Sequence, residues 1–156
     1  MNYELRPALW EDNAFLAELY ADVHASEFAS LDLSAAHLAQ LLALKFKAQR
    51  MDFAARFPDA DHSIISVENT GIGHLLLNET PTEIQLIDVA LLTPLRGAGA
   101  GAGILEQLQA YAAGRSLPLR LSVHPQNPAT RLFHRLGFVH IGEQTNALRM
   151  EWIARP

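Results

Sequence analysis

The chain has 156 residues, 49% of them hydrophobic, which suits one domain with a single core, so we expect one domain over residues 1–156. Cysteine is absent, which excludes disulfides and thiolate metal sites, and a net charge of −5 with two lysines argues against nucleic acid and favours a cationic small molecule. No apolar run reaches the roughly 18 residues that span a membrane and no signal peptide is evident, so we expect a cytoplasmic protein without membrane contact.

The first half of the chain predicts a strand, two helices and a hairpin. A short strand is expected over Tyr3–Arg6. Apolar residues at helical spacing predict a helix from about Trp10 to His24 and another from about Ser34 to Phe57, which stops at Pro58. The segment "SIISVENTGIGHLLLN" reads as two strands joined by a turn at residues 69–71.

The next segment, "EIQLIDVALL" over residues 83–92, predicts a third major strand. Its apolar alternation slips by one residue between Leu86 and Ile87. Either a β-bulge or a strand covered on both faces would produce such a slip, and both interpretations stay open.

The second half predicts two further helices and three strands. "RGAGAGAGIL" at residues 96–105 leads into a helix that ends near Gly114, and "LPLRLSV" is a strand. In "NPATRLFHRLGF", Asn127 is the expected N-cap of a helix, Pro128 its first residue, and Gly137 lies just past its end. Strands over residues 138–142 and 148–153 close the chain. This order predicts an α/β (α+β) fold with a mixed sheet.

The alternating glycines admit three interpretations. A tight turn without a ligand needs only one glycine. A dinucleotide site is suggested by Gly97, Gly99 and Ala102, which fit G-x-G-x-x-G/A. That motif should follow the strand directly, whereas residues 93–96 intervene, and no acidic residue stands where a ribose anchor is needed.

The third interpretation uses the flanking sequence as well. Arg96, Gly99 and Gly101 fit R-x-x-G-x-G between an apolar strand and an apolar helix, and "NPATRLFHRLGF" follows about 26 residues later. In these motifs the chain resembles the GNAT family of acetyl-CoA-dependent N-acetyltransferases, most specifically from about Ile84 to Phe138. The resemblance implies a mixed, mostly antiparallel twisted sheet with helices on both faces. It also implies acetyl transfer from acetyl-CoA to a primary amine by direct attack in a ternary complex.

A helix N-terminus presents unpaired amides and a partial positive charge, so a bare glycine-rich loop there lets a pyrophosphate approach. The resemblance further implies that the preceding strand pairs with the pantetheine arm. Asn127 has two open roles, to cap its helix and to contact the cofactor. The expected cofactor-binding residues are Ala90, Leu91, Leu92, Arg96, Gly97, Ala98, Gly99, Ala100, Gly101, Ala102 and Asn127.

Proton handling departs from the family pattern. Members often protonate the leaving thiolate with a tyrosine at the position of Phe133, and a phenyl ring has no proton to give. Water, Tyr111, His134 or direct transfer from the attacking amine would replace it, and Phe133 itself is explained by core packing.

Three residues are candidates for the catalytic base that deprotonates the amine: Asp88, Glu83 and His124. Asp88 interrupts an apolar strand, where an unpartnered carboxylate is costly, so it is either a structural acceptor or faces a cleft. Glu83 begins the same strand, and His124 ends the next one. His24 and Glu27 lie where related folds shape the acceptor site. No histidine spacing suggests a metal site, and we expect no metal.

The expected partner is a small-molecule or peptide amine, and exposed strand edges make a homodimer a further expectation. A non-catalytic acyl-CoA-binding module of the same fold is the alternative function that Phe133 keeps open. A dinucleotide-dependent oxidoreductase ranks third.

Overall fold

The computed structural model describes residues 3–93 and 99–155, so Arg96, Gly97 and Ala98 lie outside the described residues. Two short 3₁₀ helices flank α1, namely η1 (Trp10–Asp12) and η2 (Ala25–Leu31). The helices are α1 (Asn13–His24), α2 (Ala35–Arg56), α4 (Ala100–Arg115) and α5 (Ala129–Arg135). The strands are β1 (Glu4–Pro7), β2 (Asp61–Val67), β3 (Thr70–Glu79), β4 (Ile84–Leu91), β5 (Leu119–Val123), β6 (Val139–Gln144) and β7 (Ala147–Trp152). The helices and strands predicted from the sequence are therefore found, with bounds that differ by a few residues.

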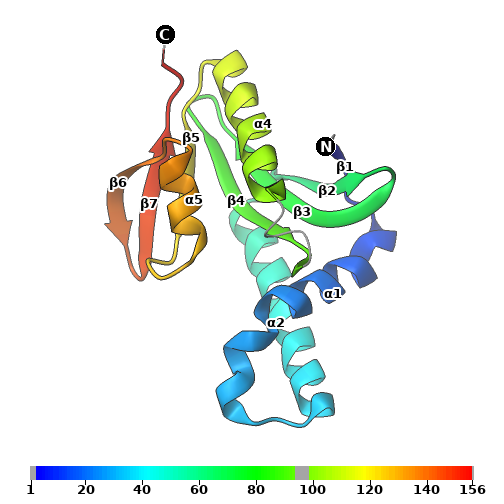
Figure 1. The fold of residues 1–156 in the computed structure, drawn as a ribbon. Helices are drawn as coiled ribbons and strands as arrows, with labels where there is room; N and C mark the ends of the chain where they lie inside the picture. Colours follow the sequence, from blue (N-terminus) through cyan, green and yellow to red (C-terminus); the bar gives the residue numbers. More distant parts are fainter. Residues whose placement is uncertain (1–2, 94–98, 156) are drawn as a thin grey trace.

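All seven strands form one sheet in the order β1-β2-β3-β4-β5-β7-β6. Only β4 and β5 run parallel, and every other neighbouring pair is antiparallel. The helix α4 connects the two parallel strands, as a parallel pair requires (Figure 1). The predicted mixed, mostly antiparallel sheet is thus confirmed.

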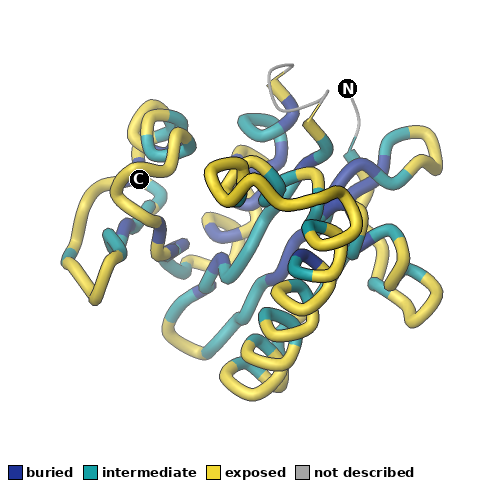
Figure 2. The backbone as a smooth tube through the Cα atoms, turned by 90° about the horizontal axis from the view of Figure 1, so that it is seen from below, coloured by how far each residue is buried: buried dark blue, intermediate teal, exposed yellow. Residues whose placement is uncertain are grey.

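Helices cover both faces of the sheet, as predicted (Figure 1). Ile64 and Ile65 are consecutive in β2 and both are fully buried, although consecutive side chains of a strand point to opposite faces. Ile65 belongs to the large core cluster that includes Ile104 of α4 and Phe133 of α5. On the other face, α1 supplies buried leucines such as Leu19. Buried segments accordingly run through the middle of the sheet in Figure 2.

A β-bulge interrupts the pairing of β3 with β4. Leu76 pairs with Asp88, but the next residue, Leu77, pairs with Leu86, so Ile87 is one residue in excess. The slip in apolar alternation is therefore a bulge. It turns Asp88 toward the α1 and α2 side, while Leu86 joins the core beside α4.

Gly73 of β3 allows this strand to approach β4 closely. A Cβ at Gly73 would lie 2.2 Å from the carbonyl oxygen of Ala90, which is backbone and cannot rotate away. We expect Gly73→Ala to lower the free energy of unfolding by about 1–3 kcal/mol, the cost of overpacking, in chemical denaturation. Gly71→Ala is the matched control, because its Cβ would only touch Ile64 and Phe15 at 3.5 Å. Equal stability of the two variants would contradict the close approach.

Local sequence explains where α5 begins and ends. The side-chain oxygen of Asn127 accepts a hydrogen bond from the amide of Ala129 (2.9 Å), so Asn127 performs the predicted capping although the helix is assigned from Ala129. Gly137 follows the helix with φ of +94°, which a glycine tolerates. The ring of Phe133 packs on Phe138 at 5.6 Å between centroids, which is the core packing that the sequence suggested.

Candidate active site

The parallel seam between β4 and β5 is short. Ile84–Leu86 pair with Leu119–Leu121, and the pairing stops there although β4 continues to Leu91. Within the described residues, the β5-facing backbone edge from Ile87 to Leu91 has no strand partner. On the other edge, the amide of Leu92 still donates to the carbonyl of Ile72 (2.9 Å). The sheet therefore offers an extended ligand a length of free backbone that includes Ala90 and Leu91.

The N-terminus of α4 follows this free edge along the chain. Gly99 has a left-handed φ of +81° and precedes the first helical residue, and its carbonyl accepts from the amide of Gly103 (3.1 Å). The amides of Ala100, Gly101 and Ala102 begin the helix and have no carbonyl partner within it. A Cβ at Gly99 would meet no described residue within 4 Å. The helix start is suited to an anion.

One of the described glycines has a packing role instead. A Cβ at Gly103 would lie 2.5 Å from the ring of Tyr3, so this glycine makes room for an aromatic ring. At Gly101, by contrast, a Cβ would make an ordinary contact with Leu132 at 3.4 Å. Packing thus accounts for part of the glycine-alanine alternation, and the positive φ accounts for Gly99.

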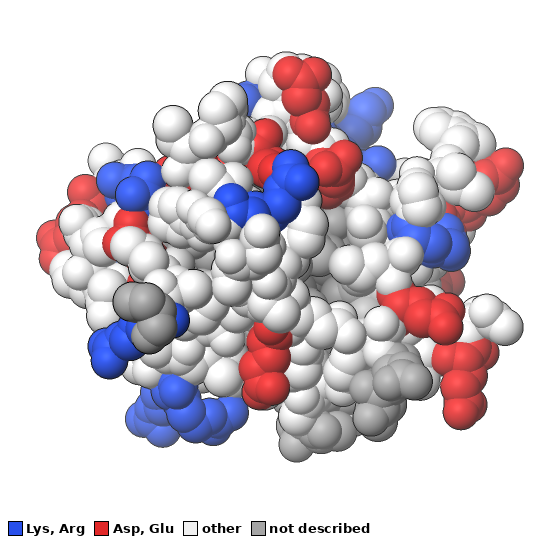
Figure 3. Space-filling model, turned by 90° about the horizontal axis from the view of Figure 1, so that it is seen from above, with Lys and Arg blue, Asp and Glu red and all other residues white. Residues whose placement is uncertain are grey.

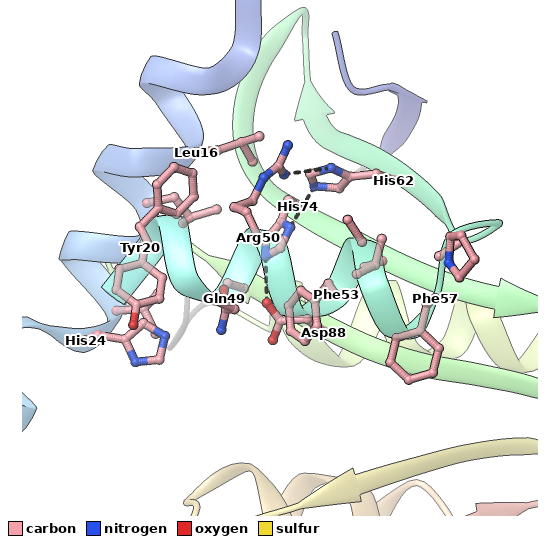
Figure 4. Close-up of a pocket in the computed structure, with 18 residues that line it drawn as sticks. Leu16, Tyr20, His24, Gln49, Arg50, Phe53, Phe57, His62, His74 and Asp88 are labelled. Carbon is pink, nitrogen blue, oxygen red and sulfur yellow. Dashed lines mark hydrogen bonds and ion pairs between the residues drawn. The ribbon is translucent and has the colours of Figure 1, made fainter. Parts of the chain in front are cut away.

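A pocket of about 220 Å³ lies between the sheet and the helices α1 and α2 (Figure 4). Most of its lining is apolar or aromatic and includes Phe46, Phe53 and Phe57. Asp88 and Ala90 of β4 also line it. The strand that carries the free backbone edge therefore forms part of the pocket wall.

A chain of hydrogen bonds crosses the pocket wall from α2 to β4 (Figure 4). The distances are 3.1 Å from Arg50 Nη1 to His62 Nδ1, 3.0 Å from His62 Nε2 to His74 Nδ1, and 2.9 Å from His74 Nε2 to Asp88 Oδ2. The side chain of His74 is 13% exposed and that of Asp88 31% exposed. Asp88 is therefore more exposed than the histidine that contacts it.

Burial, followed by the nearness of His74 and Arg50, lowers the pKa of His62 to about 4, while Asp88 and Asp12 act in the opposite direction. The unfolded chain takes up this proton near pH 6.5 and the folded chain only near pH 4, so the folded state loses stability as pH falls through that window. We expect the melting temperature to fall more steeply there for the native protein than for His62→Gln. Parallel curves for the two proteins would contradict the lowered pKa.

The structure separates the three candidate bases. Asp88 lies in the pocket. The carboxylate of Glu83 accepts from Arg120 (2.5 Å) and Gln85 (2.7 Å) and lines a different cavity. His124 is exposed after β5, where its Nδ1 accepts from the amide of Gln126 (3.2 Å).

The candidate acids lie elsewhere. Tyr111 donates to Glu79, which raises the pKa of its hydroxyl, and this tyrosine lines a cavity on another part of the sheet. His134 is exposed on α5.

The sequence did not indicate five polar residues of the pocket wall: Tyr20, Gln49, Arg50, His62 and His74. It did point to His24, whose Nδ1 lies 2.9 Å from Glu27 and whose ring stacks on Tyr20 at 4.2 Å between centroids. Burial is the main cause that raises the pKa of Tyr20, with smaller contributions from Glu27 and Asp88. The pocket's polar groups thus come from both helices and from three strands.

Two features are absent from the described residues. No group of three or more histidine, aspartate or glutamate side chains is arranged to hold a metal ion. No helix in this part of the chain has the length and hydropathy that a membrane span requires. Basic and acidic side chains are interspersed on the face seen in Figure 3.

Comparisons with known proteins agree with this geometry. The sequence profile of the acetyltransferase (GNAT) family matches residues 16–138. A search of curated protein sequences found no match. Among solved structures, PaiA N-acetyltransferase from Thermoplasma acidophilum, in complex with coenzyme A, superposes with a TM-score of 0.73 at 18% identity over 99% of this chain and 100% of that one.

An acetyltransferase from Thermus thermophilus superposes with a TM-score of 0.69 at 17% identity, over 99% of this chain and 98% of that one. At such identities the structural likeness establishes the fold. The family profile covers more than half of the sequence, including the bulged strand β4, the start of α4 and the helix α5. The chain belongs to the acetyltransferase (GNAT) family.

Proposed function

We propose that the protein is an N-acetyltransferase that transfers the acetyl group of acetyl-CoA to a primary amine bound in the pocket beneath α1 and α2. The observation that carries this proposal is the position of Asp88 and Ala90. Both line the pocket, and both belong to the part of β4 whose backbone edge is free of β5. An amine in the pocket and a thioester along the edge would therefore meet at β4.

The described residues fit the cofactor in two places. The left-handed Gly99 and the first amides of α4 suit the diphosphate, and the free edge at Ala90 and Leu91 suits the amide-bearing pantetheine arm. The proposal also includes cofactor contacts from Leu92 and Asn127, and from three residues outside the described part: Arg96, Gly97 and Ala98. When bound, acetyl-CoA supplies an acetyl group activated as a thioester.

Asp88 is the base in this proposal. A primary amine is protonated near neutral pH and must lose a proton before its nitrogen can attack a carbonyl. His74 donates to Asp88 Oδ2, and no described residue donates to Oδ1. That second oxygen is available to hold the ammonium group and accept its proton. Glu83 is paired with Arg120 instead, and His124 lies outside the pocket.

The proton balance closes without a tyrosine at position 133. The ammonium group gives one proton to Asp88 Oδ1. As the new C–N bond forms and the C–S bond breaks, the nitrogen gives a second proton to the leaving sulfur. The products are an amide, a free thiol and a protonated Asp88, so Phe133 is left to pack on Phe138.

The acceptor that fits best is a small monoamine with an apolar or aromatic body. The wall is rich in aromatic rings, and Asp88 is the only carboxylate among the lining residues that the structure describes. A second ammonium group would lie among Phe53 and Phe57 or beside the guanidinium of Arg50, where burial of a charge is costly.

Thiol release from acetyl-CoA across an amine panel tests this function. We expect phenethylamine and tyramine to be acetylated with a higher kcat/KM than spermidine, aminoglycosides, free amino acids or a peptide N-terminus. Preference for a polyamine would contradict the acceptor class. Tight acetyl-CoA binding without turnover on any amine would favour the non-catalytic acyl-CoA-binding module.

A further inference from the structure

The hydrogen bonds that link Arg50 to Asp88 can run from donor to acceptor in one direction only. A guanidinium is always protonated and only donates, so His62 Nδ1, at 3.1 Å from Arg50 Nη1, must accept. An imidazole that accepts at Nδ1 is neutral and carries its hydrogen on Nε2. Arg50 therefore fixes both the charge state and the tautomer of His62.

The same reasoning passes through the second ring. His62 Nε2 donates to His74 Nδ1 at 3.0 Å, so His74 Nδ1 must accept and the hydrogen of His74 lies on Nε2. That hydrogen is donated to Asp88 Oδ2 at 2.9 Å. Every donor in the chain thus points toward Asp88, from α2 through β2 and β3 to β4.

The surroundings of His62 agree with a neutral ring. Burial is the largest cause that holds the pKa of His62 at about 4. His74 and Arg50 also lower this pKa, whereas Asp88 and Asp12 raise it. The fixed direction also prevents the two histidines from relaying a proton away from Asp88. A proton on His74 Nδ1 would force the hydrogen of His62 to move from Nε2 to Nδ1. There it would face the guanidinium hydrogens of Arg50.

We infer that Arg50, His62 and His74 are positioning residues that lock Asp88 Oδ2 and leave Oδ1 directed at the ammonium group of the acceptor. The inference rests on the proposed function for its catalytic meaning, whereas the direction of the chain can be tested without turnover. A proton taken from the acceptor stays on Asp88 and leaves through the pocket. The two histidines remain neutral throughout.

Nitrogen NMR of isotopically labelled protein tests the direction directly, because protonated and bare imidazole nitrogens differ in chemical shift. In the native protein near neutral pH, we expect Nε2–H tautomers for both His62 and His74. In Arg50→Met, we expect the His62 signals to move toward a mixture of tautomers, while Arg56→Met, which removes an exposed arginine of the same helix, leaves them unchanged. An Nδ1–H tautomer or a charged ring at either histidine in the native protein would overturn the inference.

Kinetics with the best amine of the panel test the positioning role. His74→Gln keeps an N–H that can reach Asp88, whereas His74→Leu removes the donor. We expect His74→Leu to lower kcat/KM for the amine by about 10-fold or more, with an unchanged KM for acetyl-CoA, and His74→Gln to recover most of that loss. Equal losses in two folded variants would reduce His74 to a packing residue. If no amine is acetylated, the proposed function fails, but the tautomers still decide the direction of the chain.

Discussion

Asp88→Asn is expected to lower turnover by about 100-fold or more while acetyl-CoA binding is retained. An amide keeps the shape of the carboxylate and can still accept from His74 Nε2, but it cannot take a proton from the acceptor. The measurement is the steady-state rate of thiol release with the best amine across about pH 6 to 9. Calorimetric titration with acetyl-CoA then shows whether the second substrate is still bound.

The matched control for Asp88 is Asp52→Asn, which changes an exposed carboxylate of α2 that pairs with Arg56. We expect it to act like the native protein. Glu83→Gln separates the candidate bases, because a large loss there with near-normal turnover of Asp88→Asn would assign the proton transfer to Glu83. Near-normal turnover of a folded Asp88→Asn protein would by itself leave Asp88 a structural residue of β4.

Gly99→Val is expected to weaken acetyl-CoA binding by about 10-fold or more, measured by calorimetry. A β-branched residue is strained at the φ of +81° that Gly99 adopts, and it would add a side chain at the start of the helix where glycine has none. Both effects act on the amides of Ala100, Gly101 and Ala102, which we propose for the diphosphate.

Gly114→Val provides the control for Gly99. Gly114 lies near the other end of α4, where a Cβ also meets nothing within 4 Å. We expect this variant to bind acetyl-CoA as the native protein does. If Gly99→Val folds and binds with native affinity, the start of α4 is not the diphosphate site.

Some of the fold could be predicted because its signals are local. The slip in apolar alternation between Leu86 and Ile87 indicated a bulge in β4 as one of two interpretations, and Asn127 with Pro128 indicated the start of α5. Glycine at position 99 reflected a backbone angle that other residues avoid. Each of these signals depends on a few neighbouring residues and needs no knowledge of strand pairing.

The hydrogen-bond chain could not be predicted, because it depends on strand register and on helix placement. His62 and His74 come together only in the register that pairs β2 with β3. This register includes a shift between Ile65 and Ser66. Arg50 reaches His62 only once α2 lies on that face of the sheet. No spacing in the sequence reports either condition.

Register also decides the surroundings of the candidate bases. Arg120 reaches Glu83 because β5 lies parallel to β4 with Gln85 opposite Arg120. Asp88 lies on the pocket side because of the excess residue at Ile87. The sequence could therefore name both carboxylates, but it could not say which of them was committed to an ion pair.

The short pairing between β4 and β5 connects ligand binding with the stability of the fold. Three residue pairs, Ile84–Leu86 with Leu119–Leu121, are the only direct strand pairing described between the two halves of the sheet. A pantetheine arm laid along Ile87–Leu91 would act as a surrogate strand and extend that junction. Because a ligand bound only to the folded state shifts the folding equilibrium toward that state, the protein's resistance to unfolding would then follow the supply of its own acyl donor.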